Sequence, residues 1–119
     1  MPIQPEEVFR AVGLVRPGEW TTYGDVSTAV TGHRHGARFV GNLAATDDRF
    51  PNPARVLRSG GTVAPSPVRS SERVIARLKR EGVRFRVSRA DPSQHVHWDE
   101  LQRRAGRRAV EDARVSDPG

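Results

Sequence analysis

Apolar side chains in the first half of the chain recur every three or four residues, the spacing that places them on one face of a helix. This pattern predicts helices over residues 5–15, 22–31 and 36–45. Thr22, with Asp25 three residues later, resembles a capping box and marks the start of the second helix. Two short helices in succession, each with an apolar and a polar face, are typical of a helix-turn-helix.

A pair of glycines, Gly60 and Gly61, interrupts a run of apolar and β-branched residues that follows these helices. Glycine adopts positive φ without steric cost, so the pair suits a tight turn between two short strands over residues 56–63. The order helix, helix, hairpin predicts a mainly α fold with a small β wing, which is a winged helix-turn-helix.

One further helix and one strand are predicted beyond this wing. Ser70 or Ser71 can cap a helix that ends at Gly82, with its arginines facing outward. Residues 83–87 alternate between apolar side chains and arginine, which favours a half-buried strand with Val87 facing the core.

The last part of the chain has few apolar residues and many arginines. We therefore divide the chain into a winged-helix domain, residues 1–98, and a basic C-terminal extension, residues 99–119, which is either partly helical or disordered. Because arginine pairs well with phosphate, we expect the extension to add nonspecific contacts with DNA. The arginines concerned are Arg103, Arg104, Arg107, Arg108 and Arg114.

The charge of the whole chain also favours binding to nucleic acid. Its 119 residues carry a formal charge of +6, the sequence pI is about 11.3, and all basic residues except Lys79 are arginine. Nucleic acid is the partner that this balance favours. The alternative is arginine enrichment from genomic base composition, because a basic pI alone does not choose a ligand.

Several classes of protein are disfavoured by what the sequence lacks. There is no cysteine, which excludes disulfides, a thiolate nucleophile and cysteine-bound zinc. No run approaches the roughly 20 apolar residues of a membrane span, and the first residues do not resemble a signal peptide. We therefore expect a cytoplasmic protein without a membrane partner.

Two His-x-His pairs, His33 with His35 and His95 with His97, raise the question of a metal site, since imidazole is a common zinc ligand. Both pairs lie in predicted loops or turns, and such a site would require them to converge. The sequence therefore predicts no metal and no cofactor.

Two segments, and the spacing between them, resemble the paired signature of the O-6-alkylguanine-DNA alkyltransferase superfamily. They are Thr21–Val26 (TTYGDV) and Ala37–Asn42 (ARFVGN). Arg55–Gly61 (RVLRSGG) resembles the stretch after the family's Pro-Cys-His-Arg active-site motif, and Glu81–Val83 with Val96–Trp98 resemble the ends of its cysteine-less members, the alkyltransferase-like proteins. The resemblance covers roughly residues 5–98.

The chain departs from this family at the active-site motif. The alkyl-accepting cysteine corresponds to Pro53, or to Asn52 if one residue is inserted, and the motif histidine corresponds to Ala54. Neither proline nor asparagine can accept an alkyl group. Alkyltransferase-like proteins usually carry tryptophan there. The chain is therefore expected not to be an enzyme.

The resemblance implies binding through the minor groove, with the target nucleotide rotated out of the base stack. Arg38 matches the finger that enters the duplex, and Tyr23 matches the residue that helps to rotate the adjacent phosphate. The implied DNA-binding residues are Thr22, Tyr23, Arg38, Asn42, Arg58 and Ser59. The implied lesion pocket contains Asn52, Pro53 and Tyr23.

The sequence as a whole thus favours a non-enzymatic, monomeric sensor of O-6-alkylguanine or other damaged bases in double-stranded DNA. Such a sensor would mark lesions for nucleotide excision repair proteins. The alternative is a winged-helix module for unmodified or otherwise modified DNA, acting in regulation or beside a nuclease. A third reading, from a different class, is a true transferase or a metal-dependent activity.

Overall fold

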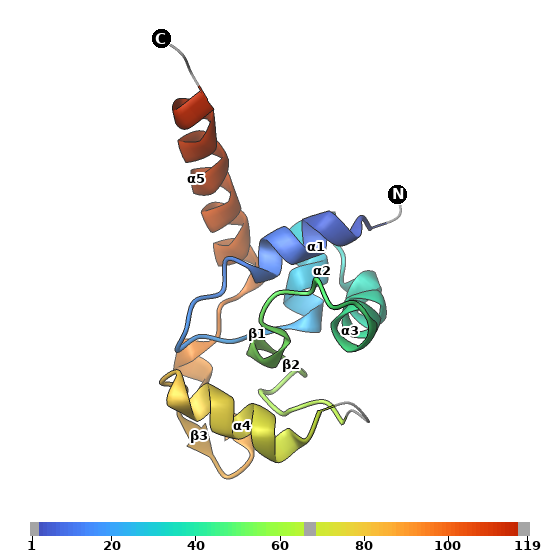
Figure 1. Cartoon of the computed structure of the whole chain (residues 1–119), viewed down its shortest axis with the longest axis vertical. Helices are drawn as coiled ribbons and strands as arrows, with labels where there is room; N and C mark the ends of the chain where they lie inside the picture. Colours follow the sequence, from blue (N-terminus) through green and yellow to red (C-terminus); the bar gives the residue numbers. More distant parts are fainter. Residues whose placement is uncertain (1–2, 66–68, 117–119) are drawn as a thin grey trace.

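The computed structural model describes residues 3–65 and 69–116 (Figure 1). In this part of the chain the helices are α1 (Pro5–Val12), α2 (Tyr23–Thr31), α3 (Ala37–Thr46), α4 (Ser71–Arg80) and α5 (Trp98–Ser116), with 3-10 turns η1 (Arg34–Gly36), η2 (Pro53–Arg55) and η3 (Pro92–Gln94). The strands are β1 (Thr21–Thr22), β2 (Val56–Leu57), β3 (Phe85–Arg86) and β4 (Arg89–Ala90).

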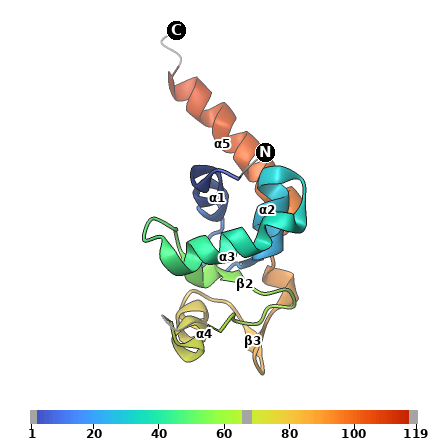
Figure 2. The same ribbon diagram turned by 90° about the vertical axis from the view of Figure 1, so that its right-hand side faces the viewer.

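The buried side chains form two clusters. The first lies among α1, α2, α3 and the start of α5, and consists of Val8, Ala11, Val12, Val15, Val26, Val40, Ala44, Phe50, Val56, Val96 and Leu101. The second lies under α4 and consists of Trp20, Ala54, Leu57, Val74, Leu78, Val83 and Ala90. In both ribbon views α4 and β3 lie at one end of the molecule, while α5 extends away from the opposite end (Figures 1 and 2).

The segment Trp20–Thr22 joins the two clusters, and its backbone is hydrogen-bonded on both sides. On one side β1 pairs in parallel with β2. On the other, the Trp20 amide donates to the Gln94 carbonyl (3.2 Å) and the Val96 amide donates to the Trp20 carbonyl (2.7 Å). The Thr21 hydroxyl, fully buried, also donates to the Val96 carbonyl (2.8 Å). Segments far apart in the sequence therefore meet at this central strand.

The predicted helices of the first half are confirmed, with small differences at their ends. Thr22 caps α2, since its hydroxyl oxygen accepts a hydrogen bond from the Asp25 amide (3.0 Å), and Gly32 ends the helix with φ 84°. α1 ends at Val12, earlier than predicted, with Gly13 as its C-cap. Glycine is a poor helix former, which is consistent with this early end.

A buried serine organises the turn between α2 and α3. The Ser27 hydroxyl donates to the His33 carbonyl (2.6 Å) and accepts from the Gly36 amide (3.0 Å). A Cβ at Gly36 would lie 2.8 Å from the Ser27 oxygen and even closer to the Ile3 side chain. Glycine therefore allows α3 to begin close to α2, which fixes the angle of the helix-turn-helix.

The predicted fold class is confirmed, but the position of the predicted wing is wrong. β2 pairs with β1 and not with residues 62–63. The glycines instead form a tight turn, in which the Gly61 amide donates to the Arg58 carbonyl (2.9 Å) and the Arg58 amide donates to the Thr62 carbonyl (2.9 Å). Both residues of β2 are buried, so the strand is covered on both faces and does not have the half-exposed character of a wing.

The antiparallel hairpin forms later in the chain, between β3 and β4. Val87, predicted to face the core, lies in the turn of this hairpin with φ 61°, and 96% of its surface is exposed. The alternation of residues 83–87 correctly predicts an extended segment. It does not reveal where the chain reverses, because that depends on pairing with a later strand.

Arg55 is the charged residue that the fold buries within the described part of the chain. Its guanidinium donates to both carboxylate oxygens of Glu81 (3.0 and 2.9 Å) and to the Val15 carbonyl (2.9 Å). Despite the burial of the carboxylate, the hydrogen bonds from Arg55 lower the pKa of Glu81 below its ordinary 4.5. This pair fastens η2 to the end of α4 and to the loop after α1.

α5 begins as part of the folded domain. Leu101 is buried in the first cluster, and Arg104 donates to both carboxylate oxygens of Glu19 (2.7 and 2.8 Å) and to the Leu14 carbonyl (2.9 Å). These contacts attach the first turns of α5 to the loop after α1. The boundary of the basic extension at residue 98 stays a prediction.

The arginines of α5 differ in how they are paired. Arg103, Arg104 and Arg107 all form ion pairs with Glu100, and hydrogen bonds from these arginines lower the pKa of Glu100 to about 2. Arg108 is exposed, while the side chain of Arg114 lies outside the described residues. Three guanidinium groups thus share one carboxylate, so Glu100 neutralises only part of the positive charge expected to contact phosphate.

No helix in residues 3–65 and 69–116 combines the length and the apolar character needed to cross a membrane.

The buried ion pair generates a stability prediction. Replacing Arg55→Ala leaves the Glu81 carboxylate and the Val15 carbonyl without this donor, so we expect the free energy of unfolding to fall by about 3 kcal/mol. Urea denaturation at pH 7 measures this loss. Because the pKa of Glu81 is lowered in the folded state, its contribution to stability is fully present above pH 4.5 and is lost as the pH falls through the lowered value.

Arg49→Ala is the matched control, because Arg49 pairs with Asp47 at the surface with 66% of its side chain exposed. That variant should lose less than about 1 kcal/mol. Equal losses for the two variants would contradict the structural role of Arg55.

Candidate nucleic-acid interface

Tyr23 is the first residue of α2, and its ring lies at the edge of a cavity of about 160 Å³. Gly41 and Ala45 of α3 and Pro53 of η2 line the same cavity. Burial raises the pKa of the Tyr23 hydroxyl above its ordinary value, while the nearby charges of Arg69 and Arg58 oppose this rise. The side chain is therefore a neutral phenol at pH 7, and its hydroxyl can donate a hydrogen bond.

Of Pro53 and Asn52, the two residues predicted at the position of the acceptor cysteine, the structure places one at the cavity. Pro53 lines the cavity beside Tyr23, whereas Asn52 is not among its lining residues in the described chain. Asn52 instead precedes η2 in a left-handed conformation with φ 44°. The structure thus brings Tyr23 and Pro53 of the predicted lesion pocket together and leaves Asn52 outside.

A larger groove of about 720 Å³ adjoins this cavity and shares Pro53, Arg69 and Val74 with it. Its arginines are Arg69, Arg73, Arg77 and Arg80. The helical pattern of α4 indicates that its arginines face outward, but nothing in the local sequence shows that α4 lies beside Pro53. The sequence therefore does not predict this arginine-lined groove as part of the candidate site.

The exposed face of α3 lies on the same side as the Tyr23 cavity. Arg38 and Asn42 are exposed, and Gly41 and Ala45, which line the cavity, are one and two turns beyond Arg38 on that helix. A Cβ at Gly41 would contact the Tyr23 ring at an ordinary 3.9 Å. Helix packing therefore does not require glycine at position 41. The side chain of Arg38 is exposed on the α3 face that carries the lining residues of the cavity.

The remaining predicted contact residues lie around the start of α2. Arg58 and Ser59 are exposed in the loop after β2, and Ser59 lines a separate cavity of about 340 Å³ together with Thr22 and Asp25. The Thr22 hydroxyl is occupied by the helix cap, and only 6% of the residue is exposed. Thr22 therefore supports the first turn of α2 and presents little side-chain surface to a ligand.

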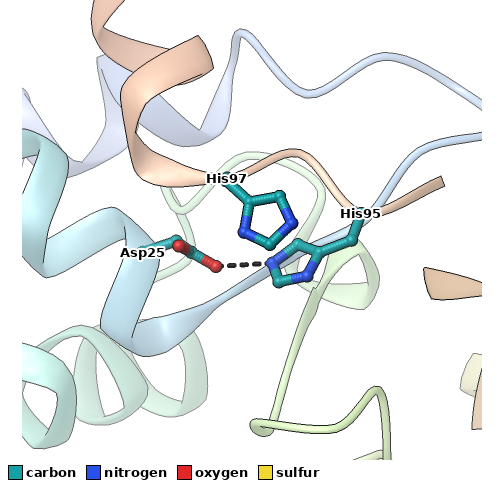
Figure 3. A group of neighbouring side chains, drawn as sticks. All are labelled: Asp25, His95 and His97. Atoms are coloured by element: carbon teal, nitrogen blue, oxygen red, sulfur yellow. Dashed lines mark hydrogen bonds and ion pairs between the residues drawn. The ribbon is translucent and has the colours of Figure 1, made fainter. Parts of the chain in front are cut away.

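Asp25, His95 and His97 form a group of polar side chains (Figure 3), and all three line the cavity that contains Ser59. Asp25 Oδ2 lies 2.6 Å from His95 Nε2 and also accepts from the Thr22 hydroxyl (2.6 Å), while Oδ1 accepts from the Trp98 amide (3.1 Å). Burial alone would raise the pKa of Asp25, but these hydrogen bonds outweigh it and lower the pKa. The Asp25 carboxylate therefore ties the start of α2 to the segment before α5.

The two His-x-His pairs occupy different surroundings. The rings of His33 and His35 stack on each other at 5.6 Å. The ring of His95 stacks on Trp20 (4.3 Å) and on His97 (3.8 Å). The pair His95 and His97 thus lies beside Asp25 and not beside the pair His33 and His35. The sequence does not predict this contact, because Asp25 and His95 are 70 residues apart.

A solved structure similar to this chain is that of S. pombe Atl1 in complex with damaged DNA containing O6-carboxymethylguanine. The two share 27% sequence identity with a TM-score of 0.61, over 76% of this chain and 92% of that chain. No protein-family model matches the chain, and no curated protein gives a significant match.

The similarity to Atl1 confirms the mainly helical, helix-turn-helix fold with its small sheet. The expected contacts of Arg38, Asn42, Arg58 and Ser59 with DNA stay predictions.

Proposed function

We propose that this chain binds double-stranded DNA, holds an O-6-alkylated guanine outside the base stack, and marks it for excision repair proteins without transferring the alkyl group. The observation that carries the proposal is the Tyr23 cavity beside the exposed Arg38 face of α3. It occurs on a fold shared with Atl1, a protein solved with damaged DNA.

The chemistry of the chain supports binding without alkyl transfer. Transfer of an alkyl group from guanine O6 requires a nucleophile that forms a stable covalent bond. The chain has no cysteine, and Pro53, which lines the cavity, has no nucleophilic atom. A lesion held beside Pro53 would therefore be bound and released unchanged.

Nucleotide flipping costs a few kcal/mol and is least costly at a damaged base pair. In the proposed complex the guanidinium of Arg38 fills the space left in the duplex and stacks on the neighbouring bases. The ring of Tyr23 supports the rotated backbone, and Arg58 adds positive charge near it. Binding energy from these contacts offsets the cost of flipping.

The size of the cavity limits what can enter. Sites that enclose small ligands typically measure about 300–1,000 Å³, and the Tyr23 cavity is about 160 Å³. A flipped alkylguanine would therefore extend past Pro53 into the adjoining groove of about 720 Å³. The arginines of that groove favour phosphate or an anionic substituent.

The small cavity also favours a second candidate, a helix-turn-helix module for undamaged DNA. Such a module would use Arg38 and the α4 arginines for phosphate contacts alone and would not admit a base.

Binding to matched duplexes, with and without one O6-alkylguanine at a fixed salt concentration, tests the proposal. We expect at least about tenfold tighter binding to the lesion, or about 1.4 kcal/mol. Equal binding would support the second candidate. A protein mass increased by the alkyl group after incubation would contradict binding without transfer.

Arg38→Ala should weaken binding to the lesion duplex by about 1–3 kcal/mol and binding to intact DNA by less, because the vacancy exists only at the flipped base. Arg38→Lys keeps the charge but loses the planar group that stacks, so it should also reduce lesion preference. Arg10→Ala is the control, because Arg10 is an exposed arginine on α1. Fluorescence anisotropy measures all three. If Arg38→Ala binds like Arg10→Ala, Arg38 is not the finger.

Tyr23→Phe should keep most of the flipping signal, whereas Tyr23→Ala should lose it, because the bulk of the ring supports the rotated backbone. A fluorescent base analogue placed opposite the lesion measures flipping. Thermal unfolding provides the control for both variants, since Tyr23 packs against the first core cluster. Normal flipping by a folded Tyr23→Ala protein would show that the ring has no part in it.

A further inference from the structure

We propose that Asp25, His95 and His97 bind a divalent transition-metal ion, for which Zn²⁺ is the probe. One ligand atom from each of these residues lies within 4.8 Å of the others. The Asp25 carboxylate points from the start of α2 toward the two imidazole rings on the segment before α5 (Figure 3). The inference is independent of whether the chain recognises damaged DNA.

The donor set selects the class of metal. Two imidazoles and one carboxylate are ligands that zinc sites use when a fourth position stays open, and they also occur in non-haem iron sites. Calcium and magnesium prefer oxygen donors, so this set disfavours them. His95 and His97 are separated by one residue in an extended segment, which directs both side chains to the same side.

Only small movements would be needed to admit the ion. A tetrahedral zinc with bonds of about 2.0–2.1 Å separates its ligand atoms by about 3.4 Å. His95 Nε2 and Asp25 Oδ2 are 2.6 Å apart and would separate slightly as zinc replaced the proton between them. The His97 ring is already tilted by 30° from the His95 ring. Its side chain is exposed and can turn toward the ion.

The surroundings hold two of the ligands in place. The Thr22 hydroxyl and the Trp98 amide orient the carboxylate, and Trp20 stacks against the His95 ring. Such supporting contacts are typical of metal sites. The adjoining cavity of about 340 Å³ gives access and room for water at the fourth position. Arg34 lines this cavity too, and its positive charge would lower the affinity without blocking the ligand atoms.

A bound ion would join the first turn of α2 to the segment before α5. Because it binds the folded arrangement, it should raise the unfolding temperature as its concentration increases. Asp25 is two residues from Tyr23, so the metal would stabilise the helix start that shapes the Tyr23 cavity.

Titration calorimetry of the chelator-treated full chain with Zn²⁺, without DNA, tests this proposal. We expect one ion per chain and a Co²⁺ absorption spectrum with d–d bands of a low-coordinate nitrogen and oxygen site. His97→Ala should weaken binding at least about tenfold, since even outer-shell partners of a metal have effects of this size. His97 is exposed, so the metal-free variant should unfold at the same temperature as the original chain.

His35→Ala is the matched control, because His33 and His35 form an exposed His-x-His pair that, among the described residues, belongs to no group of three metal-ligating side chains. This variant should bind Zn²⁺ as the original chain does. Absence of binding at one ion per chain would overturn the proposal. An equal loss of affinity in His35→Ala and His97→Ala would also overturn it, because it would indicate unspecific binding to histidine pairs.

Discussion

The structure depends on the buried segment Trp20–Thr22, whose backbone is hydrogen-bonded to β2 on one side and to residues 94–96 on the other. An unpaired backbone group in this position would cost free energy comparable to a lost hydrogen bond. The segment therefore fixes three distant parts of the chain together. Tyr23 follows this segment directly. The segment also holds β2 beside it, and the ring of His95 stacks on Trp20. The candidate interface and the histidine cluster share this one support.

The parts of the fold that the sequence predicts well are those determined by neighbours in the chain. The helices α2 and α4 each begin at a hydroxyl cap, Thr22 and Ser70, and these short-range signals locate them correctly. The helix-turn-helix follows from the succession of α2 and α3, and the motifs around Tyr23 and Arg38 point to the region where the cavity and the exposed face of α3 meet. Local chemistry is sufficient for these features.

Features that depend on distant pairing are not predictable in this way. The apolar pair of β2 looks like one arm of a hairpin, but it is buried beside β1. Arg55 has the same local appearance as Arg58, yet one is buried against Glu81 and the other is exposed. Asp25 looks like a helix-capping residue, and only the fold brings His95 to it. In each case the deciding partner is at least 26 residues away.

Pro53 has a consequence for any redesign of the site. It occupies the first position of η2, where its ring fixes the backbone, and it forms the border between the Tyr23 cavity and the arginine groove. A thiol introduced there would stand next to Ala54, which cannot act as a base, and near the buried Arg55. Conversion of this scaffold into a protein that accepts an alkyl group would thus require a neighbouring base as well as a nucleophile at position 53.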